Sequence, residues 1–158
     1  MLKSGWLAGA TLTVALSLGL SLGGCGFKTP PLPPEAVVPE TITDLRATVT
    51  ENGLILNWSY PRQTIHGREL TRIDSFELYR AEVPVDQVCD NCPIPFGRPL
   101  TVTGGEIDRE EGRTAHYEYT SLRPNHTYSF KVQARNSWWA VSSDSNTISI
   151  TWPPADNN

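Results

Sequence analysis

The residue whose setting says most about its chemistry is Cys25, because of the segment that precedes it. Lys3 gives a positive start, residues 5–22 form an uncharged run, and the small residues Gly23 and Gly24 follow. This is the three-part form of a secretory leader, so we expect cleavage just before Cys25. The run is 18 residues long, at the lower limit for a membrane span. Its Gly, Ser and Thr content makes a retained helix the weaker alternative.

The tetrapeptide Leu22-Gly23-Gly24-Cys25 resembles the lipobox of bacterial lipoproteins. That resemblance implies diacylglycerol on the Cys25 thiol and an acyl chain such as palmitate on the new amino terminus. These lipids are covalent, and no cofactor is expected. Gly26 stands where inner-membrane lipoproteins carry aspartate. The resemblance therefore implies a lipid-anchored protein of the bacterial cell envelope, with the outer membrane favoured.

Cys89 and Cys92 form a Cys-x-x-Cys pair, for which three kinds of chemistry are open. A structural disulfide is the favoured interpretation, because exported proteins meet an oxidising compartment. A thiol-redox site needs a cysteine at a helix start, and Pro93 and Pro95 disfavour a helix there. A zinc site needs two further ligands, and the chain has no second cysteine pair.

Other reactive side chains do not form a recognisable catalytic set. The three histidines, His66, His116 and His126, are scattered along the sequence. Glu110 and Glu111 are adjacent, so on a strand they face opposite ways and cannot act as a glycosidase pair. The chain has no phosphate-binding loop and no nucleophile elbow. We therefore expect no catalytic residues, no metal and no enzyme activity.

The overall composition limits the possible partners. The 158-residue chain has a formal net charge of −4, and removal of the leader leaves 134 residues at −5. No basic cluster is present, which argues against nucleic acid as a partner. A chain of this size suits one domain and a tether. Residues 25–38 are rich in proline and predict an extended, polyproline-II-like tether.

From residue 39 onward, short segments of alternating hydrophobicity are separated by turn residues. One apolar and one polar face is the pattern of a half-buried antiparallel sheet, and two such sheets must stack to bury their apolar sides. The sequence therefore predicts an all-β, antiparallel sandwich of about seven strands. The apolar positions that alternate are Leu45, Ala47, Val49, Leu54, Leu56, Trp58, Phe76, Leu78, Tyr117, Tyr119, Tyr128, Phe130, Val132, Ala134, Ile148, Ile150 and Trp152.

Three segments make this pattern specific. Residues 54–58 with Pro61 resemble the second strand of a fibronectin type III domain, and residues 76–80 resemble its third strand. Residues 122–128 resemble the family's Leu-x-Pro-x-x-x-Tyr signature. The resemblance covers residues 39–153 and implies an immunoglobulin-like sandwich, followed by a short tail at 154–158.

The signature also implies a tyrosine corner formed by Leu122, Pro124 and Tyr128. In this motif a buried tyrosine directs its hydroxyl to the backbone a few residues upstream. The chain departs from the family at about residues 83–113, where most members have one or two short strands. We call this segment the insertion. Long loops are uncommon unless they are functional or held in place, and the Cys89–Cys92 pair is a candidate brace.

Trp138 and Trp139 are the candidate partner-binding residues. They fall between the last two predicted strands, and adjacent residues of an extended chain cannot both point into the core. One or both rings can therefore form an apolar contact surface for a protein, glycan or lipid. In the alternative, marginally preferred, one ring covers the open end of the sandwich and the other lies along a neighbouring loop.

These features predict a non-catalytic, lipid-anchored module that presents a fibronectin type III domain to an envelope protein or glycan. An alternative comes from residues 25–32, whose Cys-Gly-Phe-Lys start resembles small lipoproteins that assist the lipopolysaccharide translocon. The chain would then be an accessory factor in outer-membrane assembly that acts through its amino-terminal lipopeptide. The sequence gives no prediction of the oligomeric state.

Overall fold

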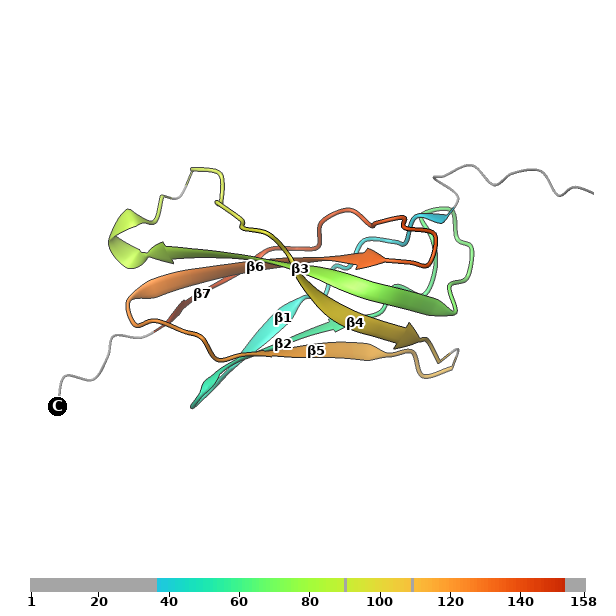
Figure 1. The fold of residues 1–158 in the computed structure, drawn as a ribbon, viewed down its shortest axis with the longest axis horizontal. Helices are drawn as coiled ribbons and strands as arrows, with labels where there is room; N and C mark the ends of the chain where they lie inside the picture. The colour runs from blue at the N-terminus through green and yellow to red at the C-terminus, as the bar shows by residue number, and fades with distance from the viewer. Residues whose placement is uncertain (1–36, 90, 109, 153–158) are drawn as a thin grey trace, which may run out of the picture. The chain divides into compact units, whose positions relative to one another are not determined.

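The computed structural model describes residues 37–89, 91–108 and 110–152, which form two antiparallel sheets (Figure 1). The leader, Cys25 and the tail lie outside these residues. The first sheet has the order β1-β2-β5, and the second has the order β4-β3-β6-β7. The strands are β1 (Arg46–Thr50), β2 (Gly53–Ser59), β3 (Arg72–Pro84), β4 (Leu100–Glu106), β5 (Thr114–Tyr119), β6 (His126–Arg135) and β7 (Ile148–Trp152).

The predicted all-β sandwich is confirmed, with seven strands in the described ranges. A 3-10 turn, η2 (Val85–Gln87), follows β3. Within the same ranges no helix is long and apolar enough to span a membrane.

The alternating positions become buried faces because strand side chains point alternately to opposite sides. In β2, Leu54, Leu56 and Trp58 are all buried, and in β6 the apolar face from Tyr128 to Ala134 is almost fully enclosed. The rings of Trp58 and Tyr60 meet the ring of Phe76 edge to face, at centroid distances of 5.4 Å and 4.8 Å. Such pairs are favoured by ring quadrupoles in addition to burial.

The predicted burial of Val49, on the apolar face of the first strand, is wrong. It pairs with Leu54 across the β1–β2 hairpin, yet it is 58% exposed while Leu54 is buried. Leu45, just before β1, is buried as predicted. Directly paired residues share one face of the sheet, so Val49 points to the same side as Leu54, but it lies one residue from the end of β1, at Thr50, where its exposure shows that little of the second sheet covers it.

Strand β3 pairs with β6 along ten residues, from Ser75 opposite Arg135 to Pro84 opposite His126. This long pairing defines two ends of the domain. One end holds the start of β6 and the segment after β3, and the other holds the loop after β6 (Figure 1). At about 3.3 Å per residue, the two ends of β6 are roughly 30 Å apart.

Part of the predicted insertion is regular structure. Strand β3 continues into it as far as Pro84, and β4 pairs with β3 in the register Phe76 opposite Val102. Among the described residues of the insertion, those between η2 and β4 and those of the β4–β5 connection are loop. The insertion therefore first lengthens β3, then forms a loop outside the four-stranded sheet, and returns to that sheet as β4.

Candidate functional site

Trp138 and Trp139 are exposed, by 69% and 80% respectively. They lie in the connection after β6, which we call the tryptophan loop (residues 136–141). Neither ring covers the open end of the sandwich, so the marginally preferred structural alternative for this pair is wrong. The physical reason is that the chain turns sharply after Arg135 and directs both rings to solvent.

The tryptophan loop is held from inside by Asn136, which is 4% exposed. Its side-chain oxygen accepts the N–H groups of Trp138 and Ala140, at 3.0 Å and 3.1 Å. Its backbone exchanges two further bonds with the loop: its N–H donates to the Ala140 carbonyl, and its carbonyl accepts from Trp139 N–H, both at 3.1 Å. The loop backbone is therefore fixed although its largest side chains are in water.

Trp139 adopts a left-handed backbone conformation, with φ of 61°. This region is unfavourable for a bulky residue that has a β-carbon, by roughly 1–2 kcal/mol. The Arg135 guanidinium lies 5.8 Å from the Trp139 ring centroid, and Arg135 also pairs with the carboxylate of Glu77. Strain of this kind concentrates where a particular side-chain direction is needed.

A small pocket of about 150 Å³ lies beside Trp138. Its polar walls include Thr64, Thr71, Arg68 and Glu69. The tryptophan loop therefore combines an apolar tip with a polar side that carries charges of both signs.

The insertion is attached to the sheet by Phe96. The Lys131 ammonium nitrogen lies 4.7 Å from the Phe96 ring centroid and 5.1 Å from that of Tyr79, so the cation is placed between two rings. Lys131 also pairs with Asp144 at 2.7 Å. One residue further, Gly97 N–H donates to the carbonyl of Arg80 on β3 at 3.0 Å.

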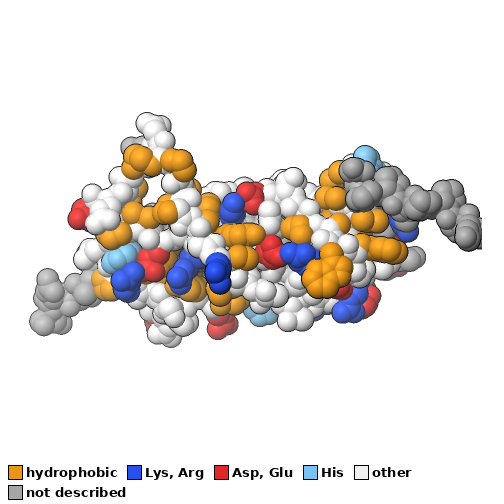
Figure 2. Space-filling model, turned by 45° about the horizontal axis from the view of Figure 1, so that its top comes forward, with side chains coloured by type: hydrophobic (Ala, Val, Ile, Leu, Met, Phe, Trp, Pro, Cys, Tyr) orange, Lys and Arg blue, Asp and Glu red, His pale blue; other side chains and the backbone are white. Residues whose placement is uncertain are grey.

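From η2 to this attachment, the insertion carries three exposed large aliphatic residues, Val85, Val88 and Ile94, which we call the insertion surface. They are between 39% and 47% exposed. Figure 2 shows hydrophobic side chains gathered on this projecting part of the molecule.

A groove of about 530 Å³ lies under the insertion, between it and the sheet. None of the described residues that line it is charged. Val83, Val88 and Ile94 contribute apolar walls, and Thr127, Ser129 and Ser149 contribute hydroxyls from β6 and β7. The Ser129 and Ser149 hydroxyls bond to each other at 2.8 Å. Walls of apolar side chains and hydroxyls favour a partly apolar ligand surface.

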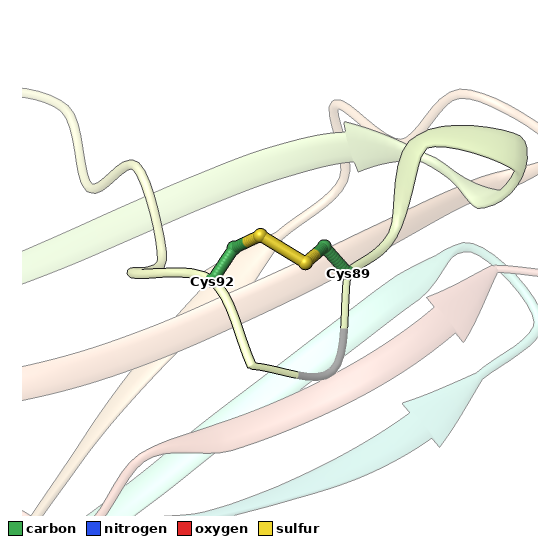
Figure 3. Close-up of a disulfide and its surroundings, with 2 residues drawn as sticks. All are labelled: Cys89 and Cys92. Carbon is green, nitrogen blue, oxygen red and sulfur yellow. A yellow bond between two sulfur atoms is a disulfide. The ribbon is translucent and has the colours of Figure 1, made fainter.

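Cys89 and Cys92 are joined by a disulfide, with 5.4 Å between their Cα atoms (Figure 3). The favoured interpretation of this pair is therefore confirmed. The bridge closes a turn in which Cys92 N–H donates to the Cys89 carbonyl at 3.4 Å. Among the described residues around the bridge, neither cysteine begins a helix.

The tyrosine corner residues come together as the family resemblance implies. The Tyr128 ring is fully buried, and its hydroxyl accepts the Arg123 N–H at 2.6 Å. The same hydroxyl donates to the Glu82 carboxylate at 2.9 Å, and that carboxylate also accepts from the Arg123 side chain. Leu122 packs against the core, and the Pro124 carbonyl lies 2.7 Å from His126 Nδ1.

This arrangement shifts two ionisation equilibria. The hydrogen bond from Arg123 is the main cause that lowers the pKa of Glu82, and the Tyr128 hydroxyl adds to it while burial opposes it. Burial raises the pKa of Tyr128. Both shifts belong to a structural network that closes the β5–β6 connection.

The remaining candidates for chemistry stay apart. His66 and His116 are exposed on different elements, and His126 lies at the start of β6. Glu110 and Glu111 donate their backbone N–H groups to the Asp108 carboxylate, as a turn. In the described part of the chain, no three His, Cys, Asp or Glu side chains are grouped to hold a metal ion.

The two stacked antiparallel sheets and the tyrosine corner define an immunoglobulin-like β-sandwich. The family model for the fibronectin type III domain matches residues 39–139, and the chain belongs to that family.

Solved structures agree with this fold. The sixth fibronectin type III domain of human fibronectin type III domain containing protein 3 has 16% identity and a TM-score of 0.50, with 84% of this chain and 97% of that chain covered. The twitchin kinase region from C. elegans has 14% identity and a TM-score of 0.50, with 73% of this chain covered. This chain spans only 17% of that twitchin chain. No curated protein sequence matches.

Sequence reasoning missed three functional features: the brace at Asn136, the groove under the insertion, and the exposure of Ile65. The Asn-Ser-Trp-Trp order carried a signal for the first, because asparagine side chains commonly bond backbone N–H groups two residues on. The groove had no local signal, since it joins side chains from β3, β6, β7 and the insertion.

Proposed function

We propose that the chain is a lipid-anchored interaction module of the bacterial cell envelope, without catalytic activity. It presents its fibronectin type III domain to a protein or glycan partner. The anchor is the covalent diacylglycerol and N-acyl lipid implied for Cys25, and the outer membrane is the favoured location. Membership of the family supports the module, because this fold hosts binding and scaffolding roles on many different surfaces.

One observation carries the proposal: the domain keeps large apolar side chains in solvent on backbone that is held in place. The tryptophan loop is fixed by Asn136, and the insertion surface is held near Phe96 and Gly97. Exposed apolar groups on a pre-ordered backbone favour binding, because little conformational entropy is lost when a partner covers them. Tryptophan is also the residue type most enriched among side chains that dominate binding energy.

Photo-cross-linking in intact cells tests the proposal directly. A photoreactive amino acid is placed at position 138, in the tryptophan loop, or at position 94, on the insertion surface. We expect a protein or glycan from the envelope to be captured from at least one position. Val49 provides the control, because it is an exposed apolar residue at the β1–β2 hairpin, away from both surfaces.

Two results would contradict this function. Capture from neither position, with the chain correctly folded and located, would remove the interaction module. Rescue of a deletion phenotype by the leader and residues 25–40 alone would instead support the alternative of an assembly factor that acts through its lipopeptide.

A further inference from the structure

Three exposed apolar residues gather where the described chain begins. Ile65, Trp138 and Trp139 are 51%, 69% and 80% exposed, and we call them the tether-end patch. Both of their loops are hydrogen-bonded to the first two described residues. Ile65 N–H donates to the Val38 carbonyl at 3.0 Å, and the Asn136 side-chain amide donates to the Val37 carbonyl. The patch is therefore fixed to the point where the tether joins the domain.

The distance from this point to the expected anchor is short. Val37 is the twelfth residue after Cys25. At about 3.1 Å per residue, even a fully extended polyproline-II segment of that length spans roughly 37 Å. The end of the domain that carries the patch is thus the end held nearest to the membrane.

We propose that the tether-end patch lies in the headgroup layer of the membrane that carries the anchor. This proposal rests on the proposed function for the lipid at Cys25. It also divides the roles of the two surfaces: the tryptophan loop contacts lipid, and the protein or glycan partner meets the insertion surface. With the patch in the headgroup layer, the insertion surface, at the other end of β6, lies up to roughly 30 Å further from the bilayer.

The side-chain chemistry of the patch suits a lipid headgroup layer. Tryptophan prefers the membrane–water interface, where its ring is among acyl carbons and its N–H reaches water or headgroups. Arg135 lies beside Trp139, where it also pairs with Glu77, and Arg68 lines the pocket beside Trp138 together with Glu69, so charged groups flank both rings. The left-handed turn at Trp139 places the two rings on an outward tip instead of against the sheet.

A lipid surface fits this patch better than a protein does. The patch is a tip of three side chains, small against the roughly 800 Å² that a specific protein interface buries on each partner, whereas the insertion surface adjoins a groove of about 530 Å³ that enlarges its contact area. A tethered patch needs little intrinsic affinity, because the tether keeps it at a high effective concentration near the bilayer.

The test uses the lipidated protein purified from its own membrane, after mass measurement of the acyl groups. It is reconstituted in vesicles of phosphatidylethanolamine and phosphatidylglycerol with brominated acyl chains, which quench nearby tryptophans. We expect brominated lipid to lower the emission of the wild type and to have at least fivefold less effect on W138S/W139S. The matched control is V88S/I94S, which also loses two exposed apolar residues but at the other end, and it is expected to behave as the wild type.

Asn136→Asp tests the hydrogen bond to the tether junction separately from the hydrogen bonds that hold the tryptophan loop. Aspartate keeps the oxygen that accepts the Trp138 and Ala140 N–H groups, but it loses the donor to Val37. We expect this variant to fold and to show weaker quenching, because the patch is no longer fixed to the tether junction.

Equal quenching of the wild type and W138S/W139S, or none in either, overturns the lipid contact. Protection of the tryptophans only after a protein is added would assign the patch to a protein interface and also overturn it. If the mass shows no lipid on Cys25, the proposed function fails separately. Co-sedimentation of that unlipidated chain with the same vesicles then tests the patch by itself, with more binding expected for the wild type than for W138S/W139S.

Discussion

The Phe96 ring contacts the ammonium group of Lys131, with 4.7 Å from Nζ to the ring centroid. This contact joins the insertion to the outer side of β6, and the Tyr79 ring contacts the same cation, with 5.1 Å from Nζ to its centroid. The disulfide, by contrast, links residues only three apart and bonds the insertion to itself. The insertion thus has a local brace and a separate attachment to the sheet, and the two can be tested independently.

Phe96→Ala is expected to release the insertion without unfolding the domain. Phe96 is not part of the buried core, so the loss in unfolding free energy should stay near 1 kcal/mol, the scale of a partly exposed cation–π contact. Hydrogen exchange of residues 91–99 should accelerate at least tenfold, while β6 stays protected. Slow exchange in the insertion of this variant would show that Gly97 and β4 suffice to hold it.

Removal of the disulfide by C89A/C92A is expected to have a small effect on stability. In the chain-entropy model, closing so short a loop contributes roughly 2 kcal/mol at most. Urea unfolding of the oxidised protein and of the variant measures the difference directly. A much larger loss would mean that the bridge supports the sheet as well as its own turn. Capture of a partner from position 94 should weaken, because the bridge lines the groove.

The sheets were predictable because their evidence is local. Leu54, Leu56 and Trp58 alternate along the strand with side chains that face the other way. Such alternation indicates a strand with one face packed against an opposite sheet. Tyr128 was predictable for a different reason, namely the residues at fixed spacing before it. Val49 shows the limit of the pattern, since burial at a strand end depends on how far the opposite sheet extends.

The candidate site was less predictable because its geometry depends on contacts between distant residues. The direction of Trp138 and Trp139 follows from the φ of Trp139 and from the bonds of Asn136, and one of these reaches Val37, 99 positions earlier. The position of the insertion depends on Phe96 meeting Lys131. No hydrophobic periodicity or motif in the sequence indicates which of these distant residues will be in contact.

Tyr128→Phe is expected to destabilise the domain by about 1–3 kcal/mol. The variant keeps the buried ring but leaves the Arg123 N–H without its acceptor and takes one donor from Glu82. Chemical denaturation at neutral pH measures the change. Tyr117→Phe serves as the control, since Tyr117 is only partly buried on β5. A loss equal to that of the control would show that the hydroxyl of Tyr128 adds nothing to stability.

Glu82 is expected to make the domain sensitive to acid. The Arg123 side chain holds the pKa of Glu82 below its ordinary value, so the folded state binds this proton less readily than the unfolded state. The stabilisation is complete above the unfolded pKa of about 4.3 and is lost as the pH falls through the lower, folded value. Unfolding free energies of the wild type and Glu82→Gln should therefore differ clearly at pH 7 and converge towards pH 3.

The matched control for this titration is Glu118→Gln, which removes an exposed carboxylate from β5. Its unfolding free energy should follow that of the wild type across the same range, because no partner with the geometry of Arg123 and Tyr128 surrounds it in the described structure. If the curves of wild type and Glu82→Gln remain parallel from pH 7 to pH 3, the carboxylate of Glu82 is not the group that couples the tyrosine corner to pH. The acid response would then have to come from another carboxylate, such as Asp108, whose pKa is lowered by hydrogen bonds from the backbone N–H groups of Glu111 and Glu110.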